Sequence, residues 1–89
     1  MSLLNSSDVR FHRVNFIRSA GRAFPVEAAM TEDEAGALFD EALALPADQF
    51  MGKLLELIRN AEQASTDRVF AAVALVTHLA EARHFVGAA

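Results

Sequence analysis

The sequence predicts an all-α protein, a compact four-helix bundle in which the C-terminal helix is apolar and central. Apolar residues recur with helical spacing along most of the chain, capping signals separate the helical segments, and no stretch offers two strands that would pair. The most apolar stretch covers 69–82 and carries no charged residue before Glu81. A helix of this kind must be surrounded by protein or lipid, and it is shorter than the roughly 20 residues that a bilayer requires.

At helical spacing this stretch divides into two apolar flanks. The flank that we expect to face the core holds Val69, Ala72, Val73, Val76, Leu79 and Ala80, and the second flank holds Phe70, Ala74 and Thr77. The helix should extend from about 66 to 86, because a capping signal begins at Ser65 and Gly87 is a natural stop. We therefore expect this helix to pack on more than one side.

The first helix is expected over 8–22. Polar residues just before it can cap it, and Phe24 should end it, because the residue before a proline such as Pro25 is pushed out of the helical region. Val9 and Phe11 alternate with polar neighbours, as they would in a short strand. A lone strand would have no partner in this chain, so the helical alternative is favoured.

Two further helices are expected over 31–45 and 47–63. The first begins with a capping box, in which Thr31 and Glu34 satisfy each other's backbone amides. Pro46 suits the first turn of the second. Their inward faces are predicted to hold Ala35, Leu38, Phe39, Ala42, Leu43 and Leu45 in the first, and Phe50, Leu54, Leu57, Ile58 and Ala61 in the second.

Length and composition restrict the classes of protein to which the chain can belong. Its 89 residues form one domain over 1–89, with a real but small core. The chain has no cysteine, which excludes disulfides and thiolate metal sites. Its N-terminus has neither a basic start nor a long apolar run, so we expect no signal peptide, no membrane contact and a cytoplasmic protein.

Charge is unevenly distributed along the chain. Residues 1–24 carry a net charge of +3 and the remainder carries −7, which gives −4 overall. The basic residues of this head are Arg10, Arg13, Arg18 and Arg22, interleaved with Phe11, His12 and Phe16. Arginine and aromatic side chains together suit single-stranded nucleic acid. The acidic body opposes such a partner, so a nucleic-acid-binding regulator is the less favoured alternative, and pairing with the chain's own acids is favoured.

Signals for chemistry are few. Glu81 and His84 lie three residues apart on a helix, a spacing that di-iron bundles use, but the inward faces of the two middle helices supply no further carboxylate. We therefore expect an exposed Glu and His, and we predict no metal, no cofactor, no catalytic residue and no enzymatic activity. His78 is expected to mark a solvent-exposed position (a solvent window) on a largely buried helix, and the alternative is a pH-sensitive interface residue.

The supply of apolar side chains exceeds what so small a core is expected to hold. The surplus is predicted to form a partner interface of Phe11, Met51, Leu55, Phe70, Phe85 and Val86, with Arg10, Arg13, Arg18 and Arg22 as its basic rim. The alternative is that some of these residues fill the core. We predict a non-enzymatic helical protein–protein interaction module, of the adaptor, antiactivator, immunity or chaperone type, that forms a homodimer or binds a protein partner.

Overall fold

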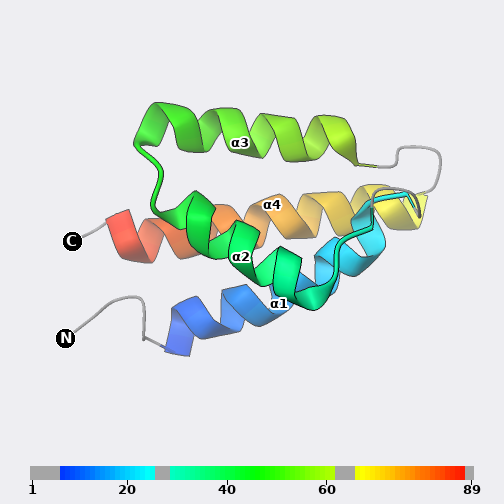
Figure 1. Ribbon diagram of the computed structural model, residues 1–89, viewed down its shortest axis with the longest axis horizontal. Helices are drawn as coiled ribbons and strands as arrows, with labels where there is room; N and C mark the ends of the chain where they lie inside the picture. Colours follow the sequence, from blue (N-terminus) through cyan, green and yellow to red (C-terminus); the bar gives the residue numbers. More distant parts are fainter. Residues whose placement is uncertain (1–6, 26–28, 62–65, 88–89) are drawn as a thin grey trace.

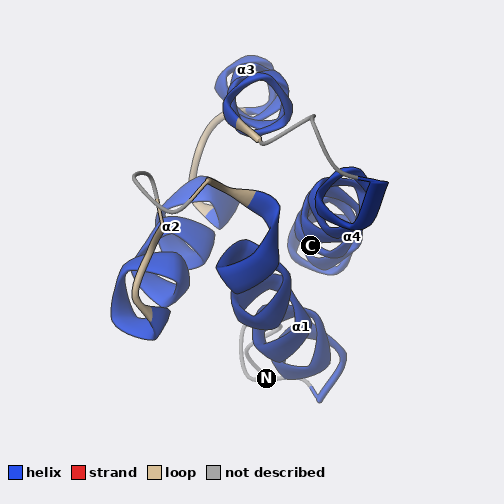
Figure 2. Ribbon diagram, turned by 90° about the vertical axis from the view of Figure 1, so that its right-hand side faces the viewer, coloured by secondary structure: helices blue, strands red, loops and turns tan. Residues whose placement is uncertain are grey.

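A computed structural model describes residues 7–25, 29–61 and 66–87, and it confirms the all-α four-helix bundle. The helices are α1 (Ser7–Ala23), α2 (Glu32–Leu43), α3 (Ala47–Asn60) and α4 (Thr66–Gly87). Successive helices run in opposite directions, and in the end-on view they form a ring in the order α1, α2, α3, α4 (Figures 1 and 2). Within the described residues, no helix combines the length and the apolar character that crossing a bilayer requires.

The start of α2 follows directly from its sequence. Thr31 Oγ1 accepts a hydrogen bond from the Glu34 amide at 3.1 Å, and the Thr31 amide donates to Glu34 Oε1 at 2.9 Å. These two hydrogen bonds lower the pKa of Glu34; the bond from the Thr31 backbone has the larger effect and the bond with the Thr31 side chain the smaller.

The end of α3 is also defined by the backbone. Ala61 adopts an extended conformation, so α3 stops at Asn60. The expected end at Gln63 and the cap at Ser65 lie outside the described residues.

The core lies between α1, α2 and α4. The rings of Phe16 from α1 and Phe39 from α2 are 5.3 Å apart, and both side chains are completely buried. Leu75 and Leu79 of α4 complete this centre. α4 contacts each of the other three helices, as α2 also does, and its contact with α1 is the most extensive between any two helices of the bundle.

The predicted inward side of α4 is only partly correct. Ala72 and Leu79 are buried, but Val69, Val73 and Ala80 face solvent. The side that packs is instead completed by Ala71, Leu75 and Ala82. Spacing did not select the correct side because α4 is apolar around most of its circumference; the extensive contact with α1 selects it.

α3 is held less firmly than the other helices. It buries Phe50 and Leu57, whereas Ile58, which we predicted to face inward, is 42% exposed. Arg83 of α4 anchors the connection before α3, because its Nη1 donates to the carbonyl oxygens of Leu43, at 3.0 Å, and Leu45. The Arg83 guanidinium also lies 5.0 Å from the centre of the Phe50 ring. One side chain therefore ties α2, α3 and α4 together.

Candidate interaction surface

The residues predicted for a partner interface do not share one environment. Phe11, Met51, Leu55 and Phe70 are the exposed ones, at 59%, 57%, 56% and 68%. Phe85 is half-buried and packs against the core. The side chain of Val86 lies outside the described residues. Three residues that the prediction assigned to inward faces are exposed and extend the apolar surface: Val69, Val73 and Ile58.

An outer face of α4 remains uncovered by the bundle. We define the α4 outer face as Val69, Phe70, Val73, Thr77 and Ala80, all of which are exposed and lie on neighbouring turns. The two valines and the phenylalanine are 39%, 55% and 68% exposed. A helix that is apolar on all sides is normally buried on all sides, so this face lacks a covering element.

A second apolar strip lies on α3, next to the α4 outer face. We define the α3 shoulder as Met51, Leu55 and Ile58, which follow one another at helical spacing and are all exposed. The polar flank of α3, with Lys53 and Glu56, lines a pocket together with Leu38 of α2. Helical spacing puts the α3 shoulder on the opposite flank of α3, away from α2, and α4 is the neighbour of α3 on that side (Figure 2). The two strips therefore form one apolar surface across α3 and α4.

The predicted basic rim is divided between two sides of α1. Arg13 faces α2, where its Nε donates to Asp40 Oδ1 at 3.0 Å and its guanidinium crosses over Gly36. A Cβ at Gly36 would lie 2.6 Å from Arg13 Nη2, so the glycine leaves the space that this arginine needs. Arg10 lines a small pocket on the same side. This pairing with the chain's own acid is the outcome that the sequence favoured over nucleic-acid contact.

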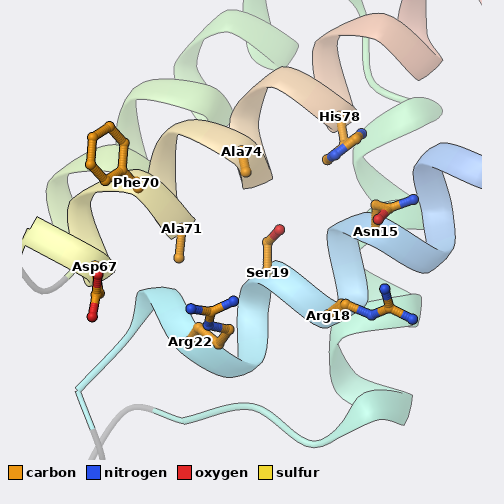
Figure 3. Close-up of a pocket in the computed structure, with 9 residues that line it drawn as sticks. All are labelled: Asn15, Arg18, Ser19, Arg22, Asp67, Phe70, Ala71, Ala74 and His78. Atoms are coloured by element: carbon orange, nitrogen blue, oxygen red, sulfur yellow. The ribbon is translucent and has the colours of Figure 1, made fainter.

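The other two arginines border the α4 outer face. Figure 3 shows a pocket of about 310 Å³ between α1 and α4, lined by Asn15, Arg18, Ser19 and Arg22 of α1 and by Asp67, Phe70, Ala71, Ala74 and His78 of α4. Within the described residues, neither Arg18 nor Arg22 forms an ion pair. Two exposed cations therefore line the same pocket as the most exposed aromatic side chain, Phe70.

A histidine pair joins α1 to α4. His12 Nδ1 and His78 Nδ1 are 2.9 Å apart, and His12 Nε2 lies 3.3 Å from Glu81 Oε2. His12 is almost completely buried, and the rings of Phe11 and Phe85 contact it. The ring centres of the two histidines are 5.2 Å apart, which places the two Nδ1 atoms close to the line between them. This alignment suits a shared proton, with one ring donating and the other accepting.

Sequence reasoning missed His12 as a structural residue and placed it with the basic head. Its spacing from Val9 and Phe16, three residues before and four residues after it, is the signal that puts it on the buried side of α1. His78 is half-buried, and it faces α1 rather than forming a solvent window. Burial, and then the nearby charge of His12, lower the pKa of His78, while Glu81 acts in the opposite direction.

The lowered pKa of His78 predicts acid sensitivity near neutral pH. Because the folded state binds this proton less readily than the unfolded state, stability should be complete above the unfolded pKa of about 6.5 and fall as pH drops below it. Urea unfolding at steps from pH 8 to pH 5 should show this decline, and His78→Gln should flatten it. His84→Gln, an exposed histidine on the same helix, is the control. An unchanged slope in His78→Gln would contradict the assignment.

The described residues contain no group of three or more His, Asp or Glu side chains placed to hold a metal ion. Glu81 turns toward His12, so Glu81 and His84 do not act together.

Comparison with known proteins finds no family, no curated relative and no solved structure that matches the chain.

Proposed function

We propose that this chain is a small helical protein–protein interaction module that works without catalysis and associates with itself. The observation that carries the proposal is the apolar surface formed by the α4 outer face and the α3 shoulder. Its six large side chains expose roughly 500 Å² between them, which is at the upper end of what a monomer usually leaves uncovered.

The composition of the surface supports binding rather than chance exposure. Aromatic and arginine side chains dominate the energetics of protein interfaces, and here Phe70 lines one pocket with Arg18 and Arg22. A nucleic-acid partner is supported less well, because Arg13 is engaged with Asp40 and the remaining surface is acidic.

Sedimentation equilibrium from micromolar to millimolar protein tests the proposal. The measured mass should rise from the 9.6 kDa of one chain toward a multiple of it as the concentration increases. Association through apolar surface should persist in high salt, whereas contacts dominated by charge would weaken. A mass of one chain at every concentration, with no protein partner recovered from its native cell extract, would refute the proposed module.

A further inference from the structure

We infer that the α4 outer face is covered by the same face of a second copy. The two α4 helices are antiparallel, and the two-fold axis that relates them crosses α4 at the level of Leu75. This inference rests on the proposed self-association and adds the surface and the arrangement. The closed form would contain eight helices, with the two α4 helices at its centre and the apolar surface of each copy buried.

The available area agrees with a dimer. The six large side chains of the α4 outer face and the α3 shoulder are all exposed, at 39% to 68% of their surfaces. Their roughly 500 Å² of apolar surface amounts to more than half of the ~800 Å² that each partner buries in a stable interface. The small and polar residues around them supply the remainder.

Side-chain size favours the antiparallel arrangement. With the axis near Leu75, Phe70 lies opposite Ala80 of the second copy, and Val73 lies opposite Thr77. The bulky N-terminal half of the face therefore meets the small C-terminal half, which lets the two helices approach closely. A parallel pair would instead set Phe70 against Phe70 and leave the small residues facing each other.

Charge favours the same arrangement. A two-fold axis perpendicular to antiparallel helices keeps both α1 helices on one flank and both α3 helices on the other. Arg22 lines one pocket with Phe70 and Ala71, so it comes to about the level of Ala80 and Glu81 of the second copy. The side chain of Glu81 is 57% exposed, which leaves room for an added ion pair beside His12. In a parallel pair, Arg18 and Arg22 would instead face the apolar α3 shoulder of the second copy and lose water without a partner.

A charged side chain placed in the α4 outer face tests whether this face forms the dimer interface. Val73→Glu should raise the dimer dissociation constant about 100-fold or more, because the substitution occurs twice in a symmetric interface. Ala37→Glu, at an exposed position on α2, is the matched control and should leave it unchanged. Circular dichroism of dilute samples shows whether each variant is folded.

Cysteine cross-linking tests the direction, since the chain has no cysteine of its own. Thr77→Cys lies near the proposed axis, and a short bis-maleimide should join two copies. In Asp67→Cys the two thiols would lie roughly 24 Å apart in the antiparallel pair, beyond the reagent's span, but close together in a parallel one. Ala37→Cys should give no cross-linked dimer.

The outcomes separate this inference from the proposed function. A wild-type chain that self-associates while Val73→Glu changes nothing would overturn the surface and leave the module standing. Cross-linking of Asp67→Cys would overturn the antiparallel arrangement, whether or not Thr77→Cys also cross-links, because Thr77 lies near its counterpart in either direction. A chain that stays monomeric but loses capture of a cellular protein in Val73→Glu would assign the face to a different partner and overturn the second copy.

Discussion

Replacing Phe16 by alanine is expected to lower the free energy of unfolding by about 3–5 kcal/mol, a large part of the roughly 5–15 kcal/mol that stabilises a typical domain. Phe16 is completely buried and its ring packs 5.3 Å from that of Phe39, between α1 and α2. Alanine would leave a cavity that the neighbouring helices fill only partly. Urea unfolding followed by circular dichroism measures the loss.

The chain offers a matched control for this substitution. Phe70→Ala removes the same atoms from a side chain that is 68% exposed in the isolated bundle. At protein concentrations below the range of self-association, it should change the free energy of unfolding by less than about 0.5 kcal/mol. Equal losses in the two variants would contradict the assignment of Phe16 to the core and of Phe70 to the surface.

Replacing Arg83 by methionine is expected to cost about 2–3 kcal/mol and to release α3 before the rest of the bundle. Methionine keeps an apolar stem but removes the donor for the Leu43 and Leu45 carbonyl oxygens and the cation beside the Phe50 ring. Since α3 buries little else, it depends on this connection more than the other helices do.

Hydrogen exchange resolved by residue measures that release. Amides of α3 should exchange at least tenfold faster in Arg83→Met, while those buried between α1 and α4 change less. Arg59→Met, at an exposed position on α3, is the control and should leave α3 protected. Uniform acceleration across all four helices would show that Arg83 stabilises the bundle as a whole and does not act on α3 in particular.

Local signals were sufficient to predict the class of fold. The capping box at Thr31 and the proline at position 46 act within a few residues, and both lie at helix starts in the structure. The inward side of α4 was not predictable in the same way. Val69 and Val73 are as apolar as Leu75, so only the position of α1 decides which of them is buried.

The candidate surface was also predictable from the sequence only in part. The surplus of apolar residues is visible in composition, and Phe70, Met51 and Leu55 are exposed in the bundle. The histidine pair was not predictable, because its members lie 66 residues apart and meet only when α1 packs on α4. Their contact depends on tertiary packing, which periodicity along one helix does not encode.

The contact between α1 and α4 joins the first of the four helices to the last, and this has a consequence for biosynthesis. A ribosome releases α1 before the other three helices, yet its most extensive neighbour is α4, which emerges after α2 and α3. Until then Phe16 and His12 lack the surroundings described for the finished bundle, and closure of so long a loop slows folding. The apolar side of α1 must therefore be kept from misassociating until α4 has emerged.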